Sequence, residues 1–330
     1  MLLAVPSLVG SALDPAIGVL GDTPRRRALI VAGSVGFAAS AVLAAGATGF
    51  GVLLAALLLG NPSSGAFVSL AQATLMDDAP DARDRNMARW TVAGSVGYVA
   101  GPVLIAAGVA TGLGWRGVLL LLALPAIPLG LAVRPAPAGG ERADWRGFLQ
   151  ALRDREVLRW LALLEAADLM LDVFHAFLAL YAVDVAGLSP VAAALAVAVW
   201  TAAGFAGDVI LLWALRRVDG STYLRATAVG ALVAYPAFLL VQSTGVKLVL
   251  LAALGLLNSG WYAIPKARLY ASLPGRSGTA VAVGGAAGLV GSLAPAALGA
   301  LAGAAGLQAT MWLLLVAPVA LLLGVRRARR

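Results

Sequence analysis

The chain has 330 residues, of which 61% are hydrophobic and 12% are charged, and its formal net charge is +8. Soluble domains are about 25% charged, so this composition excludes an ordinary soluble protein. The sequence has no cysteine and a single histidine, His175, which excludes disulfides and multi-histidine metal sites. We expect no metal and no cofactor. The basic residues are dispersed among loops, which argues against nucleic acid as a partner.

Hydrophobic runs fill almost the whole sequence, and each is long enough to cross a bilayer, which takes about 20 apolar residues. In chain order they are residues 2–22, 28–48, 50–76, 88–111, 117–134, 157–183, 190–215, 223–244, 247–271, 278–303 and 307–325. These eleven runs leave no room for a soluble domain. They predict an all-α polytopic membrane protein with eleven transmembrane helices.

The basic residues indicate the orientation of the spans. All Lys and Arg residues except Arg116 and Lys247 lie in or beside every second gap between the runs. Loops rich in Lys and Arg stay on the cytoplasmic side of the membrane. The C-terminal tail, with four arginines in 326–330, is therefore expected to be cytoplasmic, and an odd number of spans then places Met1 outside. We expect an integral membrane protein of a bacterial plasma (inner) membrane.

One linker divides the sequence into two parts. Residues 135–156 combine a Pro/Gly stretch with a short amphipathic segment, whose apolar face we expect to include Trp145, Phe148, Leu149 and Leu152. We place this linker at the cytoplasmic surface. It separates an N-terminal bundle, residues 1–134, from a C-terminal bundle, residues 157–330.

The two parts are interpreted as a repeat, because matching residues recur at an offset near 194. Asp14 corresponds to Asp208 and Pro80 to Pro274, and Pro102 corresponds to Pro295 at an offset of 193. A near-constant offset between matching spans predicts two pseudo-symmetric bundles. The run 157–183 has no partner in the first half. We therefore expect that one helix is missing at the N-terminus, so that five plus six helices are present of an inferred twelve.

Two motifs resemble a known family. Residues 18–27 read GVLGDTPRRR, which resembles the G-x-L-A-D-R-x-G-R-R loop signature of the major facilitator superfamily, with Gly21, Thr23 and Arg25 as departures. Gly97, Gly101 and Pro102 resemble the fifth-helix G-x-x-x-G-P signature that is frequent in antiporters, although the double glycine that comes after it is absent. The resemblance implies a major facilitator fold, efflux-like, with a conformational latch in the loop. Its expected members are Gly18, Asp22, Arg26, Arg27 and a partner at Asp77 or Asp78.

Four titratable residues lie in the run 157–183, namely Glu165, Asp168, Asp172 and His175. On a regular α-helix they occupy an arc of about 80° and rise about 15 Å. Membrane-embedded acids are costly and usually functional. We interpret the stripe as a relay for proton or cation coupling, with a structural hydrogen-bond network as the alternative. Asp14 and Asp208 are further coupling candidates, with pairing to neighbouring helices as their alternative.

Asn61, Trp261 and Tyr262 are candidates for the substrate cavity, because the resemblance places them on cavity-lining helices; helix packing is the alternative for the two aromatic residues. Together these features predict a secondary transporter that binds a small molecule and moves it by alternating access, with no enzyme activity. Proton-coupled efflux by antiport is the preferred mechanism. Proton-coupled uptake by symport and a non-transporting truncated fragment remain as alternatives. The expected partners are a small-molecule substrate, protons and the lipid bilayer, and the protein is expected to be a monomer.

Overall fold

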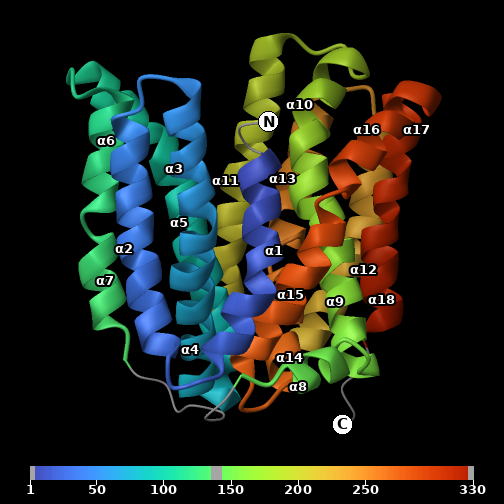
Figure 1. The fold of residues 1–330 in the computed structure, drawn as a ribbon. Helices are drawn as coiled ribbons and strands as arrows, with labels where there is room; N and C mark the ends of the chain where they lie inside the picture. Colours follow the sequence, from blue (N-terminus) through green and yellow to red (C-terminus); the bar gives the residue numbers. More distant parts are fainter. Residues whose placement is uncertain (1–3, 135–142, 326–330) are drawn as a thin grey trace. The chain divides into compact units, whose positions relative to one another are not determined.

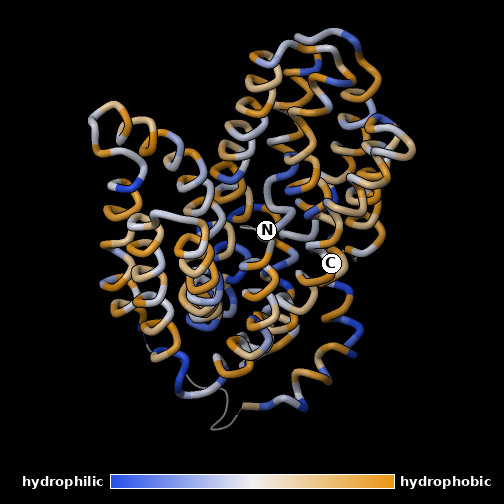
Figure 2. The backbone as a smooth tube through the Cα atoms, turned by 45° about the horizontal axis from the view of Figure 1, so that its top comes forward, coloured by the Kyte–Doolittle hydropathy of each residue, from blue (hydrophilic) through white to orange (hydrophobic). Residues whose placement is uncertain are grey.

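The computed structural model describes residues 4–134 and 143–325, and the regular structure within these ranges is entirely helical. The first group of helices is α1 (Ala4–Gly21), α2 (Arg26–Ala45), α3 (Phe50–Ser64), α4 (Leu70–Asp78), α5 (Arg83–Ala110), α6 (Gly114–Ala123), α7 (Ala126–Ala132) and α8 (Trp145–Ala151). The second group is α9 (Arg155–Asp168), α10 (Phe174–Asp184), α11 (Pro190–Ala214), α12 (Gly220–Leu240), α13 (Thr244–Leu257), α14 (Ala263–Ser272), α15 (Ser277–Gly291), α16 (Ala294–Ala305), α17 (Leu307–Trp312) and α18 (Val316–Gly324). Hydrophobic residues run along these helices (Figure 2).

All eleven predicted hydrophobic runs form helices. In the described residues, nine continuous helical stretches are long and apolar enough to cross a membrane. The other two runs give the shorter apolar helices Val5–Gly21 and Thr244–Leu257. The sequence predicts one continuous helix for the run 247–271, but the structure has two. The helix Thr244–Leu257 is therefore short. A turn over residues 258–262 separates α13 from α14, and Gly260 adopts a φ of +81° there, which only glycine takes without strain.

Two other runs contain π-helical turns, at Gly65–Ser69 between α3 and α4 and at Leu169–Val173 between α9 and α10. Such turns place one extra residue in the helix and occur frequently at functional sites. Gly65 and Gly260 correspond to each other at an offset of 195. The two halves therefore leave regular α-helical geometry at equivalent positions of the repeat.

The described chain forms two compact units, and neither coincides with one half of the sequence. The first unit comprises Met1–Arg83, Ala100–Leu158 and Leu269–Leu289. Within it, α1 and α2 both pack against α3, and α2 also packs against α6 and α7 (Figure 1). The second unit comprises Asp84–Val99, Arg159–Arg268 and Val290–Arg330.

Packing inside the second unit repeats the packing inside the first. Helices α11 and α12 both pack against α13, and α12 also packs against α18. Helix α1 therefore packs like α11, and α2 packs like α12, as the offset near 194 requires. Helix α11 has an additional neighbour, α10. The two-bundle division at residues 134 and 157 stays a prediction.

The linker contains the short helix that the sequence predicts. Asp144 caps α8 by accepting a hydrogen bond from the backbone nitrogen of Gly147 at 2.8 Å, a common way to start a helix. Phe148 is buried, while Trp145 and Leu149 are exposed. Linker residues 135–142 and the tail arginines in 326–330 lie outside the described residues.

Candidate functional site

The candidate site lies in the second unit, where α11 and α13 approach each other closely. Small residues make this approach feasible, since a Cβ atom added to Gly255 would lie 2.8 Å from the backbone oxygen of Trp200. A Cβ atom added to Gly207 would lie 2.9 Å from the Cβ of Ser259. Glycine at such crossings lets two membrane helices pack backbone to backbone. The crossing brings polar residues of both helices to the same place.

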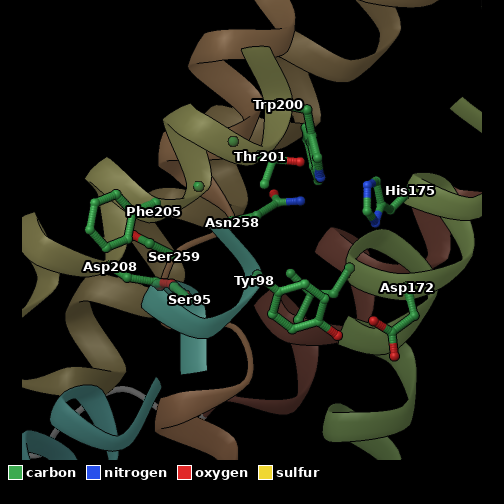
Figure 3. Close-up of a pocket in the computed structure, with 13 residues that line it drawn as sticks. Ser95, Tyr98, Asp172, His175, Trp200, Thr201, Phe205, Asp208, Asn258 and Ser259 are labelled. Carbon is green, nitrogen blue, oxygen red and sulfur yellow. The ribbon is translucent and has the colours of Figure 1, made fainter. Parts of the chain in front are cut away.

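A cavity of about 200 Å³ opens beside this crossing, and most of it is lined by α11, the end of α13 and the π-helical turn before α10. Two carboxylates, one imidazole, five neutral polar side chains and three apolar side chains line it, together with two glycines. These residues are Asp172, Asp208, His175, Ser95, Tyr98, Thr201, Asn258, Ser259, Leu171, Trp200, Phe205, Gly204 and Gly255. Asp208 and Ser95 lie on one side, Asp172 and His175 on the other, and Asn258 lies between them (Figure 3). The lining contains no lysine and no arginine.

Asp208 is one of the two carboxylates of this pocket, and it is 9% exposed. Its Oδ2 accepts a hydrogen bond of 2.6 Å from the hydroxyl of Ser95 in α5. In the described part of the chain it forms no ion pair. A neutral hydroxyl satisfies one lone pair but leaves the negative charge uncompensated, and a buried charge is stable only with a partner or when protonated.

Asn258 is the most unusual residue of the pocket, and the sequence analysis missed it. It follows the last residue of α13, is 4% exposed, and neither its amide nitrogen nor its carbonyl oxygen has a hydrogen-bond partner among the described residues. An unsatisfied buried polar group costs roughly 1–3 kcal/mol. Such groups are rare in native proteins and call for an explanation. No pattern in the sequence distinguishes this asparagine, because its significance depends on what surrounds it.

An aromatic wall closes part of the pocket. Trp200 is 7% exposed, and its ring meets that of Phe174 edge-to-face with centroids 4.8 Å apart. Phe174 in turn packs against the rings of Tyr235 and Phe238. Such edge-to-face contacts hold the indole of Trp200 in a fixed orientation. The pocket thus presents a rigid aromatic surface opposite groups that form hydrogen bonds.

A π-helical turn interrupts the helix that carries the acidic stripe. The prediction assumed a regular α-helix, but the π-helical turn Leu169–Val173 lies between Asp168 and His175. One extra residue rotates the rest of the helix by roughly 100°. Asp172 and His175 line the pocket, whereas Glu165 and Asp168 do not.

Glu165 and Asp168 lie in α9, and Asp168 interacts with both Glu165 and Asp172. Lys266 of α14 interacts favourably with the charges of both. A Cβ atom added to Gly291 would collide with the carboxylate of Glu165, so this glycine makes room for it. Lys266 therefore interacts with two acids of the same helix. It supplies the positive charge that makes two neighbouring acids tolerable.

The three residues expected to line the substrate cavity do not line this pocket. Trp261 is fully buried, and its indole nitrogen donates a 3.1 Å hydrogen bond to the hydroxyl of Thr227 in α12. It follows Gly260 in the turn that divides the predicted helix, so it packs in the interior. Tyr262 is half-buried, and Asn61 is exposed on α3. Trp261 is thus a packing residue.

The loop signature forms a tightly bonded cluster in the first unit. Asp22 accepts hydrogen bonds from the backbone nitrogens of Gly278 and Thr279, at 2.6 and 2.7 Å, and from the hydroxyl of Thr279 at 2.6 Å. These donors lie in the first turn of α15, where a carboxylate satisfies free N–H groups and the helix dipole favours negative charge. Burial raises the pKa of the Asp22 carboxyl, while these bonds and Arg26 act in the opposite direction.

Arg26 completes the cluster. It is 5% exposed and pairs with Asp77 at 2.7 Å and with Asp22 at 3.3 Å. It also donates to the hydroxyl of Ser277 at 3.0 Å and to the backbone oxygen of Gly21. Of the two partners that the sequence left open, Asp77 pairs with Arg26, whereas Asp78 is exposed and forms no such pair within the described residues.

The other members of the two motifs lie outside this cluster. Gly18 brings α1 against α15, because an added Cβ atom would lie 2.5 Å from the backbone of Gly278. Arg27 is exposed. Gly97 and Gly101 of the fifth-helix motif face open space, and Pro102 lies within the continuous helix α5. These two glycines make no close helix contact in this structure.

Asp14, the repeat counterpart of Asp208, lies in a different environment. Glycines make room for its side chain from two directions, since Cβ atoms added to Gly65 and Gly285 would both meet it. It does not line the pocket. The repeat correctly pairs the two positions, but only Asp208 belongs to the site.

A second charge cluster, which the sequence analysis did not single out, lies in the second unit. Arg268 pairs with Asp84 at the start of α5, at 2.9 Å, and with Asp219 at 3.1 Å. Asp219 also caps α12 through the backbone nitrogens of Ser221 and Thr222. At the repeat offset of 194, Asp84 corresponds to Gly278 of the first cluster. Both halves therefore place a charge cluster at the start of corresponding helices.

These features define an integral membrane protein with multiple helical spans. The sequence profile of the Major Facilitator Superfamily matches residues 1–295. The chain belongs to this family, and it is a secondary transporter and not an enzyme.

Solved structures have the same fold at low sequence identity. A variant of the E. coli fucose:proton symporter FucP matches with a TM-score of 0.80 and 16% identity, over 100% of this chain and 90% of that chain. The human organic anion transporter MFSD10 (TETRAN) matches with a TM-score of 0.79 and 20% identity, over 98% of this chain and 82% of that chain. A search of the curated proteins found no match.

Proposed function

We propose that this transporter moves a small molecule by alternating access in exchange for protons, and that the pocket beside the α11–α13 crossing binds the substrate. The observation that carries the proposal is the placement of two carboxylates, Asp172 and Asp208, in a pocket without lysine or arginine. Charges in a membrane-embedded pocket need a counter-ion or a proton. A site that alternates between a proton and a substrate couples their movements.

Proton transfer is assigned to the acids of the predicted stripe. Asp172 interacts with His175 in the pocket, and Asp168 lies between Asp172 and Glu165. Neighbouring carboxylates oppose each other's ionisation, so a proton shared among them is exchanged easily. Lys266 supports the pair formed by Glu165 and Asp168. Asp172 and His175 line the pocket, and Asp168 links Asp172 to Glu165.

The bonded cluster around Asp22 and Arg26 is assigned the role of a conformational latch. It joins the loop between α1 and α2 to the first turn of α15. These segments come from the two halves of the sequence. A transporter that rocks one half against the other must break such bonds in each cycle. The latch therefore sets the balance between open states and does not contact the substrate.

We further propose a direction of transport and a membrane for this protein. Efflux by antiport from a bacterial inner membrane fits the fifth-helix motif and the acid-rich pocket. In the symport alternative, protons move in the same direction as the substrate instead of the opposite direction. The packing of α1 against α3, which repeats that of α11 against α13, supports α1 as the counterpart of α11.

The test is a proton-flux measurement in proteoliposomes of the 330-residue chain, with a pH-sensitive dye in the lumen. Small molecules are added outside, one at a time, without an imposed pH gradient. Antiport predicts that a transported compound makes the lumen more alkaline, and symport predicts acidification.

Variants separate coupling from binding in the same assay. We expect Asp168→Asn and Asp172→Asn to abolish the dye signal, while Asp184→Asn, at an exposed position at the end of α10, keeps it. If both stripe variants give an unchanged dye signal with a transported compound, the relay is wrong and the stripe is structural.

A further inference from the structure

We propose that the pocket selects a small protonated amine whose body carries a hydroxyl or carbonyl group, with Asp208 binding the ammonium and Asn258 binding the neutral polar group. This inference rests on the proposed function of the pocket as the substrate site. It adds the chemical class of the substrate and assigns a role to Asn258.

The charge of the pocket selects a cation. Two carboxylates and no lysine or arginine line it, so an anionic ligand would meet like charges without a compensating cation. Asp172 has a nearby partner in His175. Among the described residues, the hydrogen-bond partner of Asp208 is the hydroxyl of Ser95, which occupies one of its two oxygens. The second oxygen of Asp208 is the acceptor that an ammonium group would use.

The unpaired amide of Asn258 selects a neutral polar group. Its nitrogen can donate and its oxygen can accept, and neither has a protein partner in the described residues. A hydroxyl can pair with either atom, and a carbonyl can pair with the nitrogen. A ligand that lacks both would leave the amide unsatisfied, which weakens binding beyond the loss of a contact. Asn258 therefore distinguishes among cations that Asp208 alone would accept.

The aromatic wall and the size of the cavity limit the body of the ligand. Trp200 is held in place by Phe174 and offers a flat surface to an aromatic or aliphatic group. A volume of about 200 Å³ favours a compact ligand over an extended one. An amine with one ring and one hydroxyl combines all three features.

A panel of four related compounds tests each feature separately. Tyramine carries an ammonium and a hydroxyl, phenethylamine lacks the hydroxyl, tyrosol replaces the ammonium by a neutral alcohol, and 4-hydroxyphenylpropanoate is an anion. Their affinities are measured at neutral pH by isothermal titration calorimetry with the full chain in nanodiscs. A charge-assisted hydrogen bond contributes roughly 1.5–3 kcal/mol, about 10- to 100-fold in affinity. We expect tyramine to bind at least about 10-fold more tightly than tyrosol, and the anion not to bind.

Variants assign the two groups. Asp208→Asn should weaken the affinity for tyramine by about 10- to 100-fold and the affinity for tyrosol by less than about 3-fold. Asn258→Leu should weaken the affinity for tyramine by about 3- to 10-fold and leave the affinity for phenethylamine unchanged. Because Leu is similar in size and removes an unsatisfied amide, this variant should also keep or raise the melting temperature. Asp184→Asn is the control for loss of a carboxylate outside the pocket.

Three results would overturn the inference. They are equal binding of tyramine and tyrosol, no binding of any amine in the panel, and a lowered melting temperature of Asn258→Leu with unchanged selectivity. These outcomes are independent of the proton-flux assay, because they are measured at equilibrium. If none of the tested compounds drove proton movement, that result would instead contradict the proposed function.

Discussion

Two carboxylates of this protein, the partly buried Asp22 and the buried Asp208, differ in how completely their charge is satisfied. Asp22 accepts three hydrogen bonds from the first turn of α15 and lies 3.3 Å from the guanidinium of Arg26. Asp208 accepts one bond from a neutral serine hydroxyl. A network with every member paired is rigid and specifies one arrangement, whereas an incompletely paired group leaves capacity for a ligand.

This difference in hydrogen-bond partners distinguishes a carboxylate that stabilises the structure, Asp22, from one that can bind a ligand, Asp208. Both oxygens of Asp22 accept hydrogen bonds, and these bonds join segments distant in the sequence. The pocket around Asp208 also contains the unpaired amide of Asn258. Buried charge alone does not distinguish a latch from a binding site. The number and charge of the partners does.

The largest effect is expected when the paired cluster loses its cation. In Arg26→Ala, the carboxylates of Asp22 and Asp77 would remain buried without their guanidinium. Removing one partner of a buried ion pair costs about 3–5 kcal/mol. We expect a marked fall in melting temperature and in yield of the detergent-purified protein.

The control for this prediction is the neighbouring arginine. Arg27 is exposed, so Arg27→Ala should change the melting temperature little. Equal stability of the two variants would mean that the cluster is not a stabilising network, and the contrast with Asp208 would lose its basis.

A smaller effect is expected at the helix crossing that builds the pocket. In Gly207→Ala, the new Cβ atom would lie 2.9 Å from the Cβ of Ser259 and 3.0 Å from the backbone oxygen of Leu256. Overpacking of this kind costs about 1–3 kcal/mol. Melting temperature and tyramine affinity should both decrease.

Gly94→Ala serves as the matched glycine control, since a Cβ atom added at Gly94 meets nothing within 4 Å. Should Gly207→Ala bind tyramine as tightly as the unchanged protein, the crossing would not shape the pocket.

Much of this arrangement could be predicted from the sequence, because its causes are periodic or local. The hydrophobic runs, the offset near 194 and the pairing of Asp22 with Arg26 follow from composition, repetition and a motif. The π-helical turn at Leu169–Val173 could not be predicted, since it depends on tertiary packing. Asp172 and His175 line the pocket, whereas Glu165 and Asp168 do not. The role of Asn258 was missed for a related reason, as an unsatisfied amide is recognised only from its surroundings.

The smallest effect is expected at His175, which lines the pocket beside Asp172. Replacing it with alanine removes the single imidazole of the sequence and its interaction with Asp172. We expect the pH optimum of substrate-driven proton flux to shift by about one unit or less, with substrate affinity nearly unchanged. Initial rates across a pH series measure this shift. An identical profile for the variant would remove His175 from the relay.

The contrast between the two carboxylates is tested most directly by one paired measurement on Asp22→Asn and Asp208→Asn. Tyramine affinity in nanodiscs and turnover in proteoliposomes are determined for both variants under the same conditions. The account predicts that Asp22→Asn keeps its affinity but slows turnover, because only the balance between open states changes. It predicts that Asp208→Asn loses about 10- to 100-fold in affinity. A large loss of affinity in Asp22→Asn together with unchanged binding in Asp208→Asn would contradict it.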